Sequence, residues 1–395
     1  MARLRLSPTI ALAADDNGYV AYDLRSRLLS HLNPAAALIT ELCDGTRTAA
    51  DIEAAVGPLL GPLGAQACRA WIESARTSGL ITETVTAEHA VPCGADQTDA
   101  RVFSERAWEL RDEGLIQAAF VCQWQAAYLD SASASQWHAL GELAHILGRR
   151  AVAHDAYDQY LTLEPDDAEI AHVMVSLRDE APPPRAPDRC IEQLYARFAS
   201  FYDENMCGDL DYCAPACLDT AIRQVLGEPR DLDVLELGCG TGLAGRLLRA
   251  YARRLIGIDL SQAMVTRAAA TGLYDRLEVA EITEWLGRSS AVESPVNLVA
   301  ACDALIYFGD LAQVVVPASA YLANGGCIAF TLELTDIRPF RLTDSGRYAH
   351  HPDHVRDVAA VAGLAVRQLD VVTLRYEYGE AVSGLVAVLQ KPDGS

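Results

Sequence analysis

A loop rich in glycine is the part of this sequence whose residue types and spacing point most directly to chemistry. Three alternating glycines follow the apolar run 234–237, namely Gly238, Gly240 and Gly242. Glycine is needed where a backbone must approach a ligand closely or adopt a positive φ angle. A second apolar run, 255–258, ends at Asp259, and a carboxylate there can accept hydrogen bonds from both hydroxyls of a ribose. The pattern predicts a strand, a loop, a helix and a second strand around an adenosine-type cofactor.

The residues of the loop favour one kind of cofactor. The loop lacks the glycine spacing of the dinucleotide fingerprint and the Lys-Ser/Thr pair of a P-loop. It has no basic residue to neutralise a phosphate, and Glu236 stands just before it. Acidic surroundings suit a cationic ligand, such as the amino group and sulfonium of S-adenosylmethionine. The sequence therefore predicts S-adenosylmethionine as the cofactor.

This loop resembles motif I of the class I S-adenosylmethionine-dependent methyltransferases, E/D-x-G-x-G-x-G. Three further segments resemble later motifs of that family in the usual order: Val279–Glu281, Asn297–Asp303 and Gly325–Phe330. The resemblance covers about residues 189–392 and implies a Rossmann-like domain. The alternatives are a Rossmann-like domain with a degenerate pocket and one that binds NAD.

The resemblance also implies a set of cofactor-binding residues. Asp259 would hold the ribose, and Glu281 would cap the adenine amino group, where the family more often has Asp. The full implied set is Glu236, Gly238, Cys239, Gly240, Gly242, Asp259, Leu260, Ser261, Met264, Glu281, Ile282, Cys302 and Asp303.

A sulfonium is already an activated electrophile. A methyltransferase must therefore mainly hold the nucleophile, the methyl group and the sulfur in line and exclude water. The candidate catalytic residues are Tyr202, Tyr307, Arg347, His350 and His351. Tyr307 is expected to lie near the methyl group. Arg347 could orient a carboxylate acceptor, whereas His350 or His351 could take a proton from an amine or a hydroxyl. The sequence leaves this choice open.

Composition excludes several classes of partner. The chain has 395 residues and a formal net charge of −22, which argues against nucleic acid and anionic membrane surfaces as partners. No apolar run is long enough to span a bilayer, and the first residues lack the apolar segment of a secretory signal. The eleven cysteines include no CxxC pair, which predicts reduced thiols, no metal site and a cytoplasmic location. The oligomeric state is not predicted.

The chain is expected to be a multidomain α/β protein. A proline-rich linker at 181–188 and a softer boundary at 88–99 separate three parts. These are a winged-helix-like domain at 1–88, a helical repeat-like block at 100–180 and a Rossmann-like domain at 189–395. Within the middle block, Ser135–Ala168 resembles one tetratricopeptide repeat and Phe103–Ala134 a degenerate copy. That block could space the outer domains or bind a peptide.

The first 85 residues follow the order of three strands and then three helices. Ile10–Ala13 and Tyr19–Asp23 predict a hairpin, and Leu28–Leu32 a third strand. Asn33 and Thr48 are expected to cap the first two helices, and Ala65–Ser78 is expected to be the third. The order is winged-helix-like, for which DNA binding is the alternative function; the expected third helix has few basic residues.

The segment Leu38–Ile52 resembles PqqD-like domains, the recognition elements of ribosomally made, modified peptide pathways. The resemblance covers residues 5–84. It implies that a leader peptide adds as a strand beside Leu28–Leu32 and rests against the helix that carries Trp71 and Ala75. The resulting hypothesis is a methyltransferase of a ribosomally synthesised precursor peptide. A small-molecule methyltransferase and a non-catalytic adaptor remain the alternatives.

Overall fold

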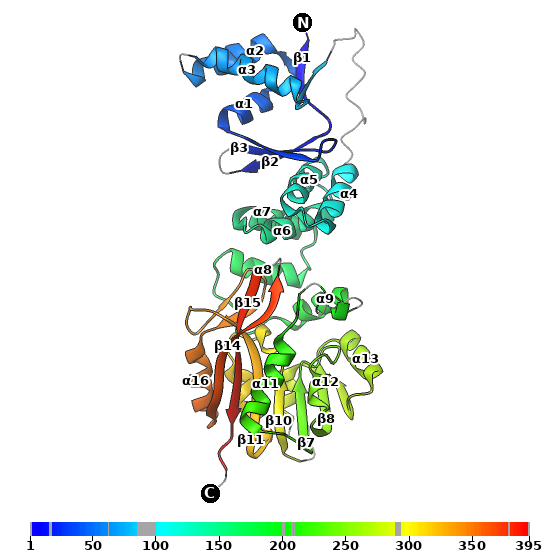
Figure 1. The fold of residues 1–395 in the computed structure, drawn as a ribbon, viewed down its shortest axis with the longest axis vertical. Coiled ribbons are helices and arrows are strands. Elements are labelled where there is room, and N and C mark those ends of the chain that lie inside the picture. The colour runs from blue at the N-terminus through cyan, green and yellow to red at the C-terminus, as the bar shows by residue number, and fades with distance from the viewer. Residues whose placement is uncertain are drawn as a thin grey trace. The chain divides into compact units, whose positions relative to one another are not determined.

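The computed structural model describes residues 2–15, 18–61, 63–84, 100–199, 202–204, 206, 208, 210–288, 294–377 and 380–393. The chain divides into two compact units, Met1–Pro165 and Asp166–Ser395 (Figure 1). This division groups residues 166–188 with the C-terminal part of the chain, whereas the sequence placed its boundaries at 181–188. The softer boundary expected at 88–99 lies outside the described residues.

Two small antiparallel sheets form the first part of the N-terminal unit (Figure 1). One has the order β2-β3-β4 and contains Ile10–Asp15, Gly18–Asp23 and Leu28–Leu32. The other has the order β5-β1-β6 and contains Asp44–Thr48, Arg3–Leu6 and Ile81–Thr84. The predicted hairpin and third strand are confirmed. Strands β1 and β5 were not predicted from the sequence: β5 is a run of polar residues, and β1 alternates Arg with Leu over only four residues.

Three α-helices lie between β4 and β6, with β5 between the first two, and their beginnings were predicted correctly. Helices α1 (Pro34–Leu42) and α2 (Ala49–Val56) begin after the expected caps. The Asn33 side chain accepts a hydrogen bond from the backbone N–H of Ala36 at 2.9 Å. Thr48 and Asp51 form a reciprocal capping box. Helix α3 (Gly64–Thr77) buries Cys68, Ile72 and Ala75 in the apolar cluster that also contains Leu4 of β1.

The described residues from 100 onward in this unit form four helices arranged as two hairpins. They are α4 (Ala100–Asp112), α5 (Ile116–Leu129), α6 (Ala134–Ile146) and α7 (Arg150–Leu163). Helix α5 packs on α4, α6 and strand β2. Gly141 on α6 lies against the ring of Tyr157 on α7, so that any larger side chain at 141 would overlap the ring. The close packing of these two helices depends on that glycine.

The C-terminal unit is built around one large, mostly parallel sheet (Figure 1). Its strands among the described residues are β7 (Leu232–Leu237), β8 (Ala252–Asp259), β9 (Arg276–Val279), β10 (Val296–Ala301), β11 (Leu322–Leu334), β12 (Phe340–Leu342), β13 (Tyr348–His350), β14 (Ala365–Glu377) and β15 (Glu380–Gln390). The order is β12-β13-β11-β10-β7-β8-β9, with β15 pairing to both β11 and β14. The core of this unit is Rossmann-like, as expected.

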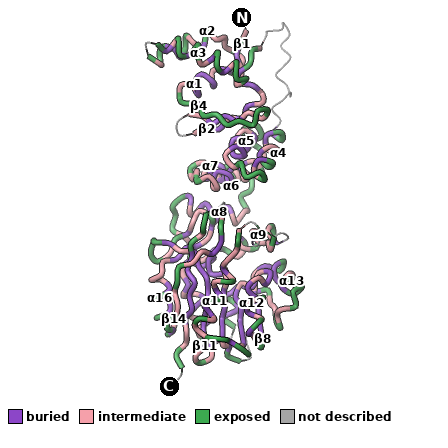
Figure 2. The backbone as a smooth tube through the Cα atoms, in the orientation of Figure 1, coloured by how far each residue is buried: buried purple, intermediate pink, exposed green. Residues whose placement is uncertain are grey.

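Helices cover both faces of this sheet. The main ones are α11 (Ala214–Leu226), α12 (Gly245–Leu248), α13 (Gln262–Thr271), α14 (Ile282–Leu286), α15 (Ala312–Tyr321) and α16 (Pro352–Val361). Successive side chains of a strand point to opposite faces, so Val234 packs in the cluster beneath α11 and Leu235 in the one beneath α15. Figure 2 shows the resulting buried strands between more exposed helices. No described helix combines the length and apolar character needed to cross a membrane.

The proline-rich segment 181–188 belongs to the C-terminal unit and is anchored there. The backbone N–H of Ala186 donates to the carbonyl of Tyr307 at 2.8 Å, and the N–H of Gly309 donates to the carbonyl of Pro184 at 2.9 Å. Ala186 is fully buried. The sequence analysis described this segment as a linker; in the structure it lies along the loop that follows β10.

Candidate functional site

The glycine loop joins the C-terminal end of β7 to α12 and holds the Asp259 carboxylate in place. The backbone N–H of Gly240 donates to Asp259 Oδ2 at 2.9 Å, and that of Ser261 donates to Oδ1 at 2.8 Å. Gly238 has a φ of +70°, and a Cβ at this position would overlap the side chain of Ala304. Backbone groups therefore fix the orientation of the carboxylate.

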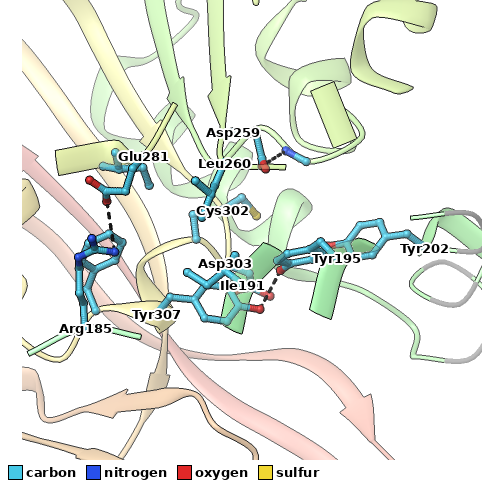
Figure 3. Close-up of a pocket in the computed structure, with 15 residues that line it drawn as sticks. Arg185, Ile191, Tyr195, Tyr202, Asp259, Leu260, Glu281, Cys302, Asp303 and Tyr307 are labelled. Carbon is cyan, nitrogen blue, oxygen red and sulfur yellow. Dashed lines mark hydrogen bonds and ion pairs between the residues drawn. The ribbon is translucent and has the colours of Figure 1, made fainter. Parts of the chain in front are cut away.

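A cavity opens at this edge of the sheet (Figure 3). Its lining comes from the glycine loop, from the ends of β8, β9 and β10, from helix α9 (Asp188–Phe198) and from the short helices α10 (Tyr202–Glu204) and η3 (Leu305–Tyr307). The lining residues are Arg185, Ile191, Tyr195, Tyr202, Gly238, Gly240, Asp259, Leu260, Glu281, Ile282, Cys302, Asp303, Ala304, Tyr307 and Phe308.

Many of the residues that the sequence singled out meet in this cavity, and others lie outside its lining. The lining includes Tyr202, Gly238, Gly240, Asp259, Leu260, Glu281, Ile282, Cys302, Asp303 and Tyr307. The residues outside it are Glu236, Cys239, Gly242, Ser261, Met264, Arg347, His350 and His351. Sequence reasoning did not select Arg185, Ile191, Tyr195, Ala304 and Phe308. The amphipathic pattern of α9 places Ile191 and Tyr195 on one face and could have indicated those two.

Glu236 lies beneath the glycine loop and is almost fully buried. It accepts a hydrogen bond from the Tyr274 hydroxyl at 2.7 Å. Burial raises the pKa of Glu236 to about 8, and the nearby Asp259 carboxylate adds to the rise. Glu236 is thus largely protonated at neutral pH and supports the loop from below.

Glu281 marks one end of the cavity. Its Oε2 accepts a hydrogen bond from the backbone N–H of Glu284 at 2.8 Å, which caps helix α14. Its Oε1 lies 3.8 Å from Arg185 Nη1 (Figure 3). Arg185 also pairs with Asp188. The proline-rich segment therefore supplies a cation to this end of the cavity, already paired with two carboxylates.

Tyrosines gather at another part of the cavity. The hydroxyls of Tyr195 and Tyr307 lie 2.8 Å apart and form a hydrogen bond (Figure 3). The ring centroids of Tyr195 and Tyr202 are 6.0 Å apart in an edge-to-face arrangement. Burial raises the pKa of each of these three hydroxyls, so all three stay neutral at physiological pH.

A buried network of charged side chains lies behind Asp303. Thr331 Oγ1 donates to Asp303 Oδ1 at 2.8 Å, and Arg375 Nη1 lies 3.6 Å from Asp303 Oδ2. Arg375 is 3% exposed and also pairs with Glu333 and Glu377. Asp303 has a φ of +49°, which turns the chain sharply after β10. The network fixes the base of the cavity.

The structure gives Arg347, His350 and His351 roles other than the expected contact with an acceptor. Arg347 Nη1 lies 2.8 Å from Glu377 Oε1, which commits its charge to the buried network. His351 caps helix α16 by accepting a hydrogen bond from the backbone N–H of Asp353 at 3.1 Å. The sequence pattern could not show the pairing of Arg347, because Glu377 lies on another element, whereas the cap by His351 is local and was missed.

His350 is fully buried, and its Nε2 lies 2.8 Å from the carbonyl oxygen of Phe308. Burial lowers the pKa of His350 to about 4, and the neighbouring His354 contributes. A neutral imidazole thus donates to the loop after β10 and holds it in place. His350 acts on the cavity through Phe308 and Tyr307, and does not line it.

Comparison with known proteins identifies the domain that carries this cavity. Residues 235–328 match a family model described as "Methyltransferase domain". The chain is 34% identical over 128 residues to the human methyltransferase-like protein 27; the match covers 32% of this chain and 49% of that protein. The chain thus spans about half the length of this curated relative.

The C-terminal unit thus contains a methyltransferase domain. Two solved structures are similar to it at low identity. Magnesium protoporphyrin IX methyltransferase (ChlM) from Synechocystis PCC 6803, with bound SAM, is 15% identical with a TM-score of 0.35, over 45% of this chain and 79% of that chain. The N-methyltransferase NodS from Bradyrhizobium japonicum is 19% identical with a TM-score of 0.36, over 45% and 87% of the two chains.

The cavity of the methyltransferase domain fits S-adenosylmethionine. A Cβ added to Gly240 would meet no atom within 4 Å, so this glycine borders open space. Asp259, Glu281 and Asp303 line the cavity. Their acidic side chains suit a ligand that carries a positive sulfonium and an amino group. The loop provides no basic side chain for a phosphate.

Proposed function

We propose that this protein transfers a methyl group from S-adenosylmethionine to a ribosomally synthesised peptide, and that the N-terminal unit binds the leader of that peptide. The first half of the proposal rests on the methyltransferase domain and its cavity. The second half rests on one observation above all, the exposed edge strand β4.

The cavity supports a division of labour among its residues. Bound S-adenosylmethionine supplies the activated methyl group. Asp259, held by two backbone N–H groups, would accept hydrogen bonds from the ribose hydroxyls. Glu281 would accept a hydrogen bond from the adenine amino group. The tyrosines opposite the glycine loop would exclude water and orient the acceptor.

Strand β4 has the features of a docking edge. It pairs with β3 on one side only, and no described strand pairs with its other side. Leu28 is 65% exposed and Leu29 is 40% exposed. An extended peptide can add to such an edge through backbone hydrogen bonds, while apolar side chains on both strands pair across the sheet. Exposed leucines on an open edge are otherwise an aggregation hazard, which supports a partner that covers them.

Helix α3 supports the same interpretation in part. Trp71 is partly buried and packs against both apolar clusters of this part of the unit. Ala75, which we expected in the wall of the peptide groove, is 4% exposed and belongs to the core. Trp71 is thus the better candidate for contact with a leader. We propose a winged-helix-like, PqqD-like domain, with helices α4–α7 as the spacer that follows it.

The proposal can be tested with short peptides encoded beside the gene for this chain, incubated with the full chain and S-adenosylmethionine. Mass spectrometry would report methylation. Binding of the leader raises the local concentration of the core, so a L28D/L29D variant should methylate a full precursor about tenfold more slowly or worse at low peptide concentration. The matched control is L59D/L63D, which changes two leucines that are each 72% exposed elsewhere in the N-terminal unit.

The outcomes separate the parts of the proposal. Equal methylation of a precursor and of its leaderless core would contradict leader capture. Methylation of a small metabolite but of none of the peptides would favour a small-molecule methyltransferase. A wild-type protein that binds no S-adenosylmethionine in calorimetry would favour a non-catalytic adaptor.

A further inference from the structure

We infer that the tyrosine-lined part of the cavity binds a basic amine as the methyl acceptor, in preference to a carboxylate. This inference deepens the proposed function and rests on it. The sequence left open whether the acceptor is a carboxylate, which Arg347 could orient, or an amine or hydroxyl, from which His350 or His351 could take a proton. None of these three residues lines the cavity, so the type of acceptor must be inferred from the residues that do.

Three aromatic rings from separate elements border this part of the cavity. Tyr195 on α9 packs edge-to-face against Tyr202 on α10 and Tyr307 on η3, with centroid distances of 6.0 Å in both pairs. The three residues lie together in Figure 3, and the hydrogen bond between Tyr195 and Tyr307 fixes two of the rings. Aromatic faces attract an ammonium group by about 0.5–2 kcal/mol and offer nothing comparable to a carboxylate.

The arginines behind the tyrosines are already engaged by carboxyl groups. Two guanidiniums, Arg347 and Arg375, share their contacts with three carboxylates, Asp303, Glu333 and Glu377. The two arginines lower the pKa of Glu377 to about 2 despite its burial, which shows how strongly they interact with it. A carboxylate acceptor would therefore compete with carboxylates already in place for both guanidiniums.

Arg185 is the one arginine or lysine among the described lining residues, and it is poorly placed for a carboxylate acceptor. Its guanidinium pairs with Asp188 and lies 3.8 Å from Glu281. In Figure 3, Arg185 and Glu281 lie together at one side of the cavity, and Tyr195 and Tyr202 lie at the other. A carboxylate at the tyrosines would therefore be desolvated without a cationic partner, with only neutral hydroxyls to donate to it.

The chemistry of the transfer agrees with this charge distribution. An amine that has lost a proton to solvent forms the new N–C bond with its lone pair while the C–S bond of the donor breaks. The positive charge then moves from sulfur to nitrogen, and the donor leaves as a neutral thioether. The cavity thus holds one cation before and after transfer, which neutral aromatic faces and nearby carboxylates stabilise throughout. A carboxylate acceptor would end the step with no cation at all.

The inference can be tested by binding, without turnover. The full chain is saturated with S-adenosylhomocysteine, which lacks the sulfonium, and titrated with n-butylamine, n-butanol and butyrate, three probes of similar size. We expect butylamine to bind at least about tenfold more tightly than the other two, which corresponds to about 1.4 kcal/mol. Equal binding of all three, tighter binding of butyrate or butanol, or no binding of butylamine would overturn the inference.

Two variants of one tyrosine locate the effect. Y202A removes a ring, and we expect it to weaken butylamine binding several-fold, whereas Y202F should retain most of that binding. Y128A is the matched control, because Tyr128 is 60% exposed on helix α5 of the other unit. Circular dichroism would verify that each variant is folded.

The same titrations separate this inference from the proposed function. If Y202A weakens S-adenosylmethionine but leaves S-adenosylhomocysteine and butylamine unaffected, the ring serves the sulfonium of the cofactor and the amine site is wrong. If the wild-type protein binds neither cofactor form, the methyltransferase proposal itself fails.

Discussion

The two sides of the cavity are built in different ways. On the cofactor side, backbone groups position the key side chain: the N–H groups of Gly240 and Ser261 hold the Asp259 carboxylate. On the opposite side, side chains from several elements meet, among them Tyr195 of α9 and Tyr307 of η3. Backbone N–H groups are present whatever the side chain, whereas a site made of side chains can change its ligand by single substitutions. Substitutions should therefore alter acceptor binding more readily than cofactor binding.

The largest effect is expected in the charged network of the acceptor side. R375A removes the guanidinium that contacts Asp303, Glu333 and Glu377. It leaves buried Asp303 without its paired cation and leaves Arg347 alone to pair with the two glutamates. Breaking a buried ion pair from one side costs about 3–5 kcal/mol. Urea unfolding would measure the loss. R356A is the control, since Arg356 pairs with Asp353 at the exposed surface of α16. A similar loss of unfolding free energy in R375A and R356A would show that the buried network contributes no more to stability than an exposed ion pair.

The next effect tests the cofactor side. D259A removes the expected acceptor of the ribose hydroxyls, and hydrogen bonds to a charged group contribute about 1.5–3 kcal/mol each. We therefore expect S-adenosylmethionine binding to weaken about hundredfold or more in calorimetry. D357A, an exposed aspartate on α16, should leave the affinity unchanged. Wild-type affinity in D259A would mean that Asp259 does not contact the ribose.

A smaller effect separates backbone strain from a direct clash. Gly238 and Gly272 have nearly equal φ angles of +70° and +67°, but only Gly238 faces a side chain that an added Cβ would overlap. G272A should cost about 1 kcal/mol of stability from strain alone. G238A should cost more and should also weaken cofactor binding, because Ala304 must shift. If both variants behave alike, the packing of Ala304 on the glycine loop is unimportant.

The two sides should also respond to pH with opposite signs. The folded pKa of Glu236 is raised to about 8, so the folded protein holds a proton that the unfolded chain loses above about pH 4.5, and stability falls as pH rises from about 4.5 to 8. His350 has a folded pKa lowered to about 4, so only the unfolded chain binds its proton below about pH 6.5, and stability falls as pH drops from about 6.5 to 4.

Two variants resolve these contributions, each with a slope of at most about 1.4 kcal/mol per pH unit. E236Q should remove the loss toward alkaline pH. H350Q, which keeps a donor for the Phe308 carbonyl, should remove the loss toward acidic pH. Stability curves measured by urea unfolding between pH 4 and 8 would show this, and unchanged slopes in both variants would refute the assignment.

The cofactor side was predictable from the sequence because its residues follow one another closely. Gly238 and Gly240 directly follow β7, and Asp259 ends the adjacent strand β8; the apolar runs of both strands are evident, so the spacing already predicts the geometry. The N-terminal helices were predictable for a related reason, since a cap such as Asn33 acts within one turn. Local rules suffice wherever partners are near in the sequence.

The acceptor side was predictable only in part because its partners are distant in the sequence. Tyr307, which the sequence predicts near the methyl group, lines the cavity, but its hydrogen-bond partner Tyr195 lies on a helix over a hundred residues earlier. Residue type alone suggested roles for Arg347 and His350, yet it could not show that carboxylates on other strands and a loop carbonyl engage them. Those pairings depend on the packing of the whole sheet.

The run of prolines before α9 has a consequence for how this domain can be inherited. Its backbone satisfies the N–H of Gly309 and the carbonyl of Tyr307, and Arg185 supplies part of the cavity wall. A gene fusion that joined a new N-terminal module at residue 189 would lose all three. The smallest fragment that keeps these contacts therefore begins upstream of Pro183. A new partner domain fused to that fragment would be joined through the proline-rich segment.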